Sequence, residues 1–325
     1  MKDSYGRMID YMRISITDRC NLRCKYCMPD GISCVPMEEI LTLEEICQVA
    51  AAGAELGIRY LKVTGGEPLV RKNCCHLIRE LKQIPGIEKV TITTNGILLE
   101  EYLEPLVEAG IDGINISMDT QDRQKFQGIT GTDGADRVLE EIRRASAFPV
   151  KVKVNAVSLD LGEENLRQMT ELARAYPVDV RFIEMMPIGY GKHFPVLDHR
   201  KLLQWLRQQY PAIEEDKSFH GFGPAVYYRI PGFQGGIGLI SAIHGKFCDT
   251  CNRVRLTSQG ELKTCLCYEE GVDLRAILRQ ETDGDKKKEG LKQAMMQAVE
   301  RKPGAHCFDS PDRITEQRSM VMIGG

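Results

Sequence analysis

The stretch Asp18-Arg19-Cys20-Asn21-Leu22-Arg23-Cys24-Lys25-Tyr26-Cys27-Met28-Pro29 directly follows an apolar, strand-like run, Met12–Ile16. Its three cysteines are spaced C-x3-C-x2-C, so their thiolates can converge on one metal site. Iron–sulfur cubanes are usually held by four cysteines, so three suit a [4Fe–4S] cluster with one iron open to another ligand. The alternative is a zinc knuckle with Cys34 as its fourth ligand, although C-x3-C is not the usual zinc spacing.

Composition and length set the broad class of the protein. The 325 residues are 42% hydrophobic and 27% charged, which is typical of a globular chain with two or so domains or one elaborated barrel. The net charge of −3 argues against a nucleic-acid binder driven by bulk charge. The N-terminus has no signal-peptide pattern, and no apolar run approaches the ~20 residues that cross a bilayer. We therefore expect a cytoplasmic protein with reduced cysteines and no membrane association.

Six apolar strand-like runs alternate with helical stretches in the first two-thirds of the chain. The runs are Met12–Ile16, Ile58–Thr64, Lys89–Thr94, Ile111–Met118, Val150–Val157 and Val178–Met185. Helices are expected from the capping box Thr42-Leu43-Glu44-Glu45 to about Gly57, and over about Asn73–Lys82, Glu100–Ala109, Ala135–Ala147, Glu163–Ala175 and Asp198–Gln209. This alternation predicts a parallel α/β fold, either an open (β/α)6 barrel or a doubly wound sheet.

The strand-like runs alternate apolar and polar residues, whereas fully buried parallel strands are nearly continuously apolar. If the apolar side faces the helices, Arg13, Lys62, Lys153 and Arg181 point inward. The alternative is a sheet with one face in solvent, which the intervening helices disfavour. Several inward cations require an anion to offset the cost of burying them, and a triphosphate fits.

The pattern changes after about residue 215, which divides the chain into 1–215 and 216–325. Short β-like pieces follow at Ala225–Ile230, Gly236–Ser241, Arg253–Thr257 and Glu261–Cys265. We expect a smaller β-rich extension that closes over the barrel, then a charged loop at Gln280–Gly290 and a final helix at Leu291–Arg301. The remainder, Lys302–Gly325, lacks periodicity.

A second cysteine motif, Cys248-x2-Cys251-x13-Cys265, lies in this C-terminal part, with Cys267 as a possible fourth ligand. A zinc ribbon is one interpretation of the spacing. A second iron–sulfur cluster is favoured by the first cysteine motif and by Arg253 and Arg255, which share one face of a strand and can donate to an anion.

The first motif, with an aromatic residue (Tyr26) before its last cysteine, resembles the signature of radical S-adenosylmethionine (SAM) enzymes. Its flanks, Asp18-Arg19-Cys20-Asn21 and Cys27-Met28-Pro29, resemble the GTP 3′,8-cyclase family, which begins molybdenum cofactor biosynthesis. The resemblance implies an incomplete (β/α)6 TIM-type barrel with a β-rich C-terminal extension. It also implies that Cys20, Cys24 and Cys27 hold a [4Fe–4S] cluster whose open iron is chelated by SAM.

The resemblance extends to the other site residues. The second cysteine motif resembles the family's second [4Fe–4S] site, whose open iron contacts guanine. It consists of Cys248, Cys251 and Cys265, and Cys251 is followed directly by Asn-Arg-x-Arg-Leu-Thr. Gly65-Gly66-Glu67-Pro68 resembles its Gly-Gly-Glu-Pro motif. By the same resemblance, the residues expected to contact SAM are Tyr26, Gly66, Ser117 and Met186. Those expected to hold GTP are Arg13, Lys62 (where many members have Arg), Thr93, Lys153, Arg253 and Arg255. The end, Gly324-Gly325, resembles a tail that reaches toward the active site.

The implied activity is that of a radical SAM lyase. SAM would be cleaved to a 5′-deoxyadenosyl radical that removes hydrogen from ribose C3′ of GTP, and C3′ would then attack guanine C8. The product would be (8S)-3′,8-cyclo-7,8-dihydroguanosine 5′-triphosphate. Implied partners are an electron donor such as flavodoxin or ferredoxin, cyclic pyranopterin monophosphate synthase as recipient of the product, and a second copy in a homodimer. The alternatives are a radical SAM peptide-modifying maturase with an auxiliary cluster and a zinc-ribbon binding module.

Overall fold

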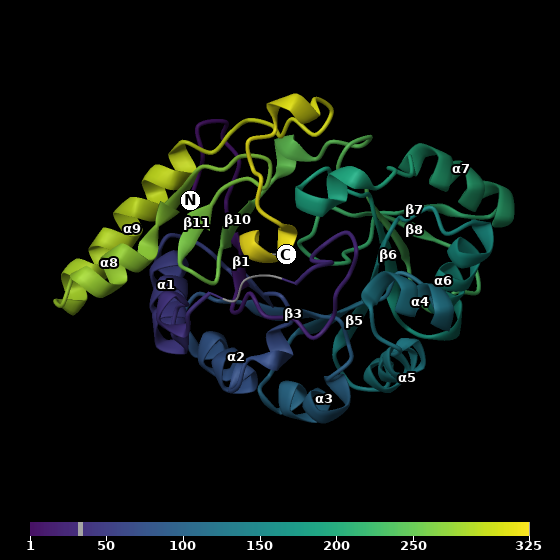
Figure 1. Ribbon diagram of the computed structural model, residues 1–325, viewed down its shortest axis with the longest axis horizontal. Helices are drawn as coiled ribbons and strands as arrows, with labels where there is room; N and C mark the ends of the chain where they lie inside the picture. The colour runs from purple at the N-terminus through teal and green to yellow at the C-terminus, as the bar shows by residue number, and fades with distance from the viewer. Residues whose placement is uncertain (32–34, 325) are drawn as a thin grey trace.

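The protein is built around one curved twelve-stranded sheet (Figure 1). The structure is a computed structural model, and it describes residues 1–31 and 35–324; Cys34 and Gly325 lie outside the described residues. The strands are β1 (Tyr11–Ser15), β2 (Tyr60–Thr64), β3 (Lys89–Thr94), β4 (Gly113–Ser117), β5 (Lys151–Val157), β6 (Asp179–Ile183), β7 (Glu214–Asp216), β8 (Val226–Arg229), β9 (Ile237–Ile240), β10 (Arg253–Leu256), β11 (Glu261–Lys263) and β12 (Gly271–Asp273). Their order in the sheet is β12-β11-β10-β1-β2-β3-β4-β5-β6-β9-β8-β7.

Helices cover the outer face of this sheet (Figure 1). They are α1 (Leu43–Glu55), α2 (Cys74–Gln83), α3 (Leu99–Glu108), α4 (Arg123–Thr130), α5 (Ala135–Ser146), α6 (Glu163–Ala175), α7 (His199–Gln209), α8 (Leu274–Gln280) and α9 (Gly284–Glu300). Single 3-10 turns occur at Met37–Glu39, Pro68–Val70, Gly189–His193, Cys248–Thr250, Pro311–Arg313 and Met320–Ile323. Strands β1 to β6 pair in parallel and in chain order, which confirms the predicted parallel α/β barrel. The described strands run from β12 to β7 without closing the ring, so the barrel is incomplete.

The alternation of apolar and polar residues separates the two faces of the sheet as predicted. Met12 and Ile14 are completely buried beneath the outer helices, whereas Arg13 between them is half-buried on the inner face. The predicted capping box of α1 is present, with the Thr42 hydroxyl accepting from the Glu45 amide at 3.1 Å. Because side chains alternate along a strand, the buried apolar set fixes which polar side chains must point inward.

The C-terminal strands join both edges of the barrel. Strand β10 pairs in parallel with β1, and β9 pairs in parallel with β6, each followed outward by antiparallel strands. The extension therefore continues the sheet on either side of its opening. None of the helices in the described part of the chain is both long and apolar enough to cross a membrane.

Three helical segments differ from the sequence-based expectations. Helices α4 and α8 were not predicted, and the predicted loop Gln280–Gly290 is wrong from Gly284, where α9 begins. The Asp283 carboxylate caps α9 by accepting from the backbone amides of the next turn. Lys288 of this charged segment pairs with Glu55 of α1, so the charges form a helix face that lies beside α1 rather than a loop (Figure 1).

Candidate functional site

The predicted inward cations come together on the inner face of the sheet. The strand register places Arg13 opposite both Arg255 of β10 and Lys62 of β2. On the other side of the barrel, Lys153 of β5 is opposite Asn115 of β4, which is itself opposite Thr93 of β3. Because register neighbours on one face have adjacent Cβ atoms, these side chains form a continuous polar lining.

Burial, and then electrostatic repulsion within this lining, lowers the pKa values of its basic groups. Burial, together with repulsion from Arg181 and Arg13, holds the pKa of Lys62 well below its usual range. Burial and Arg181 lower the pKa of Lys153 to about 7, and burial lowers that of Arg13 to about 10. The pKa of Arg255 is also held well below its usual range by burial and by Arg13. The inner face is therefore a concentration of positive charge that a bound anion would offset.

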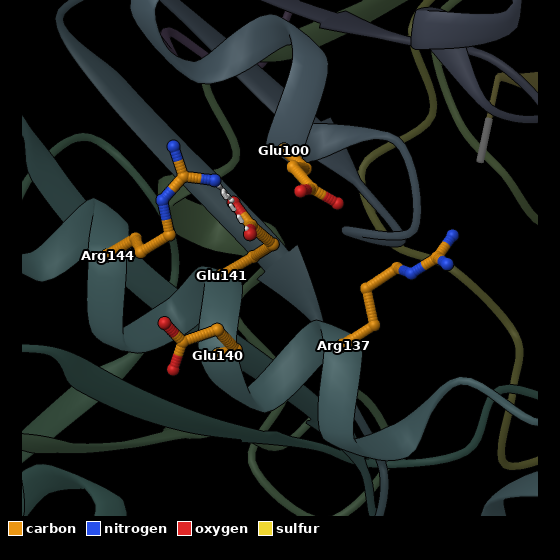
Figure 2. Close-up of a pocket in the computed structure, with 5 residues that line it drawn as sticks. All are labelled: Glu100, Arg137, Glu140, Glu141 and Arg144. Atoms are coloured by element: carbon orange, nitrogen blue, oxygen red, sulfur yellow. Dashed lines mark hydrogen bonds and ion pairs between the residues drawn. The ribbon is translucent and has the colours of Figure 1, made fainter.

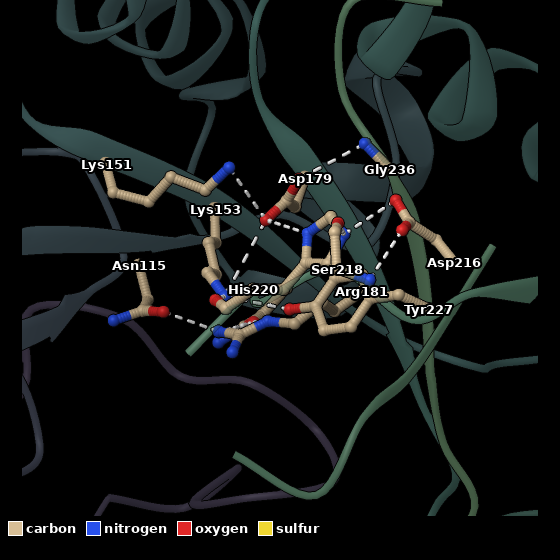
Figure 3. A network of polar contacts seen from close by, with 11 residues as sticks. Asn115, Lys151, Lys153, Asp179, Arg181, Asp216, Ser218, His220, Tyr227 and Gly236 are labelled. Atoms are coloured by element: carbon tan, nitrogen blue, oxygen red, sulfur yellow. Dashed lines mark hydrogen bonds and ion pairs between the residues drawn. The ribbon is translucent and has the colours of Figure 1, made fainter. Parts of the chain in front are cut away.

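Arg13 and Arg181 are held differently within the lining. The Nε atom of Arg13 is buried and has no hydrogen-bond partner among the described residues, so it is a donor available to a ligand. Arg181 instead donates from Nε to Asn155 Oδ1 at 2.9 Å and from Nη2 to Asn115 Oδ1 at 2.5 Å (Figure 3). Sequence reasoning did not single out these two asparagines, although their inward position on β4 and β5 was the available signal.

The first cysteine motif forms the loop that follows β1. Cys27 donates its backbone amide to the carbonyl of Cys24 at 2.9 Å, and the Cys20 sulfur accepts the Leu22 amide at 3.4 Å. Burial raises the pKa of both Cys24 and Cys27, and the nearby Cys20 thiol raises both further. The structure thus brings the three thiols close enough to interact electrostatically at one end of the barrel.

The Gly-Gly-Glu-Pro turn after β2 packs against this loop. A Cβ atom at Gly66 would collide with the carbonyl oxygen of Arg19, so only glycine allows the two backbones to approach this closely. Glu67 is buried and accepts from the Thr94 hydroxyl at 2.8 Å and the Asn95 amide at 2.6 Å. Burial raises the pKa of Glu67 to about 7 despite these donors. The turn therefore positions the cysteine loop.

The other residues expected near SAM lie around the same end of the barrel. Tyr26 donates its hydroxyl to Asp119 Oδ2 at 2.8 Å, and the other Asp119 oxygen accepts the Val157 amide at 2.8 Å. Burial raises the pKa of Asp119 to about 6. Ser117 is the last residue of β4 and Met186 follows β6; both are half-buried. Asp119, which fixes the cysteine-loop tyrosine, was not found by sequence reasoning.

The second cysteine motif lies at the base of β10. The thiols of Cys248, Cys251 and Cys265 are close enough that the first two affect the pKa of the third, which burial raises. Burial alone would raise the pKa of Cys251, but the charges of Lys302 and Arg253 lower it to about 7. These cations favour the thiolate, which is the form that binds metal.

Cys267, considered above as a fourth ligand, is paired with another cysteine. Its Sγ lies 2.8 Å from Sγ of Cys307, and the Cys307 amide also donates to Cys267 Sγ at 3.2 Å. Both residues are buried. In this arrangement Cys267 interacts with the C-terminal segment, and three thiols are left for the second site.

Both triads have the donor set of a cluster with one open iron. Three thiolates, one for each of three irons, is the arrangement that such a cubane needs. Within residues 1–31 and 35–324, no group of three His, Cys, Asp or Glu side chains is placed to hold a single metal ion. The C-terminal segment approaches both sites, since Arg255 Nη1 donates to the Gly324 carbonyl at 3.4 Å and the Val321 backbone contacts Cys27.

A separate hollow lies on the outside of the molecule, between α3 and α5 (Figure 2). It has a volume of about 560 Å³ and is lined by charged side chains, including Arg144, which pairs with Glu141 at 3.0 Å. None of its lining residues belongs to the cysteine motifs or to the cationic inner face. We therefore regard it as a solvated surface between helices.

Comparison with known proteins gives consistent results over the whole chain. The Radical SAM superfamily matches residues 14–175, and Molybdenum Cofactor Synthesis C matches residues 178–308. The chain is 40% identical over 327 residues to the GTP 3′,8-cyclase of Clostridium perfringens (strain SM101 / Type A), covering 100% of both. It is 42% identical over 326 residues to the GTP 3′,8-cyclase of Peptoclostridium acidaminophilum, covering 99% of this chain and 98% of the relative.

A solved structure also shares the fold. Streptococcus suis SuiB bound to S-adenosylmethionine superposes with a TM-score of 0.65 and 14% identity, covering 97% of this chain and 77% of SuiB.

Proposed function

The chain belongs to the GTP 3′,8-cyclase family of radical SAM enzymes, and on this premise we propose that it converts GTP to (8S)-3′,8-cyclo-7,8-dihydroguanosine 5′-triphosphate, in molybdenum cofactor biosynthesis. The observation that carries this proposal is the cationic inner face located between two cysteine triads. The Nε atom of Arg13 on this face is buried and has no hydrogen-bond partner among the described residues, so it is a donor that a bound nucleotide could satisfy.

The two triads would hold two [4Fe–4S] clusters: Cys20, Cys24 and Cys27 the first, and Cys248, Cys251 and Cys265 the second. When bound, the first cluster and SAM supply the 5′-deoxyadenosyl radical that removes hydrogen from ribose C3′. Tyr26, Gly66, Ser117 and Met186 would surround SAM. Residues 1–215 would thus provide the radical-generating barrel, and residues 216–325 the second cluster and the tail.

The protein's own contribution is to bind and orient GTP. Arg13, Lys62, Lys153, Arg253 and Arg255 would receive the triphosphate, with Thr93 as an uncharged donor. Arg181 is already fixed by two asparagine side chains, so it offers a donor whose orientation requires no reorganisation. Lys62 would act as a point charge, because an ammonium cannot form the two-pronged contact of a guanidinium.

The proposed reaction needs an electron donor and an enzyme that receives its product. The electron needed to start the reaction would come from a flavodoxin or ferredoxin, and the product would pass to cyclic pyranopterin monophosphate synthase. A cytoplasmic location would keep the cluster cysteines reduced. A homodimer is the assembly that family resemblance implies.

Anaerobic incubation of the reconstituted protein with SAM, dithionite and GTP tests the function. We expect 5′-deoxyadenosine and the cyclised triphosphate to form together, and only when GTP is present. Formation of 5′-deoxyadenosine without GTP would contradict the assignment of GTP as the substrate. About eight irons per chain are expected for two cubanes; two zincs in a colourless protein would instead support the zinc-ribbon alternative.

We expect the protein to take up protons on its lysine side chains when it binds GTP. In the free protein the pKa of Lys153 is lowered to about 7 and that of Lys62 lies well below its usual range. The negative charge of the triphosphate should raise both values, so affinity should fall as pH rises from about 7.5 to 9. Calorimetry in buffers of different ionisation enthalpy measures the protons taken up.

The Lys153→Met variant provides the control for this titration. It should take up about one proton fewer than the wild type at pH 8, because the methionine cannot be protonated. Binding without proton uptake in the wild type would contradict the proposed contact between triphosphate and lysines.

A further inference from the structure

Lys153, one of the residues proposed to bind GTP, is fixed from outside its own strand. Its ammonium donates to the Tyr227 hydroxyl at 2.9 Å and to the backbone carbonyl of His220, and lies 3.6 Å from the Asp179 carboxylate (Figure 3). These three groups come from β8, from the segment between β7 and β8, and from β6. An ammonium has three N–H donors, and the two hydrogen bonds to Tyr227 and His220 fix its direction. Asp179 at 3.6 Å is an ion-pair partner beyond hydrogen-bond distance, so the third donor can serve a ligand.

His220 is itself held on three sides. Its Nδ1 lies 3.1 Å from Asp179 Oδ2, its Nε2 lies 2.9 Å from Asp216 Oδ2, and its ring stacks on Tyr227 with centroids 3.9 Å apart (Figure 3). Both ring nitrogens face carboxylate oxygens, so the ring is held on two opposite edges as well as on one face. A ring held in this way also fixes its own backbone carbonyl, which is the group that accepts from Lys153.

Asp179 connects this arrangement to the barrel. Its side chain is only 1% exposed; it accepts the Gly236 amide at 3.1 Å and pairs with Lys151 at 3.1 Å. These donors and the neighbouring lysines hold the pKa of Asp179 below its usual range although burial opposes them. The carboxylate therefore stays ionised and links the imidazole of His220 to the two lysines of β5.

Residues 216–223, which we call the clasp, reach across the barrel from this anchor. Phe222 stacks on Tyr60, the first residue of β2, with centroids 3.3 Å apart. A Cβ atom at Gly221 would lie 3.4 Å from Lys153 Nζ, and one at Gly223 would lie 3.9 Å from Arg181 Nη1. The clasp thus crosses the end of the barrel at which the parallel strands begin, directly beside the cationic lining.

We propose that His220 is a positioning residue for the substrate: clamped between Asp179 and Asp216, it directs the Lys153 ammonium toward the phosphates of the nucleotide. The inference rests on the proposed function, because it assumes that a nucleoside triphosphate occupies the inner face. Without the clamp, the amino group of Lys153 remains but loses its fixed direction, so phosphate binding weakens while the chemistry at the ribose is unaffected.

The test compares GTP with guanosine in the reconstituted full-length enzyme. For His220→Ala we expect KM and the dissociation constant for GTP to rise about tenfold, with kcat within about twofold of the wild type. Guanosine, which has no phosphates, should bind both proteins equally. Tyr227→Phe keeps the ring stack but removes one acceptor for Lys153, so it should weaken GTP binding by about threefold. This variant tests the proposal if His220→Ala does not fold.

Val226→Ala is the matched control: this residue of β8 lies outside the clasp, points to the opposite side of the strand from Tyr227 and is 48% exposed, so the change should leave all these constants unchanged. Unchanged GTP affinity in both His220→Ala and Tyr227→Phe would overturn the proposal. An equal loss for GTP and guanosine would also overturn it, because that result indicates a general structural defect. A wild-type protein that does not bind GTP would instead overturn the proposed function on which the inference rests.

Discussion

Replacing Arg255 with alanine is expected to abolish cyclised product while leaving the N-terminal cluster in place. Arg255 is opposite Arg13 in the strand register, and burial together with the charges of Arg13 and Arg253 holds its pKa well below its usual range. It also donates to the Gly324 carbonyl at 3.4 Å. Loss of one guanidinium from a buried phosphate site should weaken GTP binding by roughly a hundredfold or more. Product formation, measured by chromatography under anaerobic conditions, is the direct assay.

Two further measurements separate this effect from loss of folding. Removing Arg255 relieves repulsion with Arg13 in the substrate-free protein, so the unfolding temperature should not fall by more than a few degrees. The Arg59→Ala control removes a half-exposed guanidinium that pairs with Glu88 on the surface, and it should retain full activity. Normal turnover by the Arg255→Ala variant would refute the assignment of the second site.

Replacing Lys263 with methionine is expected to lower the free energy of unfolding by about 3–5 kcal/mol. Its Nζ lies 2.7 Å from Glu316 Oε2, and both side chains are fully buried. The same ammonium donates to the carbonyls of Tyr268 and Glu269. Removing it leaves a buried carboxylate whose remaining charged partner among the described residues is Arg318, and it leaves two carbonyls without this donor. Both changes cost more than losing an exposed pair. Urea denaturation measures the change.

The matched control is Lys246→Met, which breaks an exposed pair with Asp309 of nearly the same length, 2.7 Å. It should change stability by less than about 1 kcal/mol. The double variant Lys263→Met/Glu316→Leu, which buries no unpaired charge, should recover part of the loss. If both single substitutions lowered the free energy of unfolding equally, burial would not determine the cost of breaking the ion pair.

Much of the barrel could be predicted because its signals are local. Strand β3 matches its predicted bounds, and the other five central strands differ by only a few residues at their ends, since alternation of apolar and polar residues specifies a strand. The charged stretch before Leu291 was predicted wrongly as a loop. Its helical state depends on the Asp283 cap and on the ion pair of Lys288 with Glu55 of α1, a helix more than two hundred residues earlier in the chain.

The sequence alone identified the first cysteine triad, whose three thiols lie within eight residues, and the side of the sheet on which Arg13, Lys62, Lys153 and Arg181 lie. Ligand spacing and strand alternation operate over a few residues, so they can be recognised without the fold. Only the tertiary structure decided which groups meet: His220 with Asp179, Arg181 with Asn115, and Cys267 with Cys307, pairs that are 41, 66 and 40 residues apart. Such contacts depend on strand order and register, because side chains far apart in the chain become neighbours only when the sheet forms.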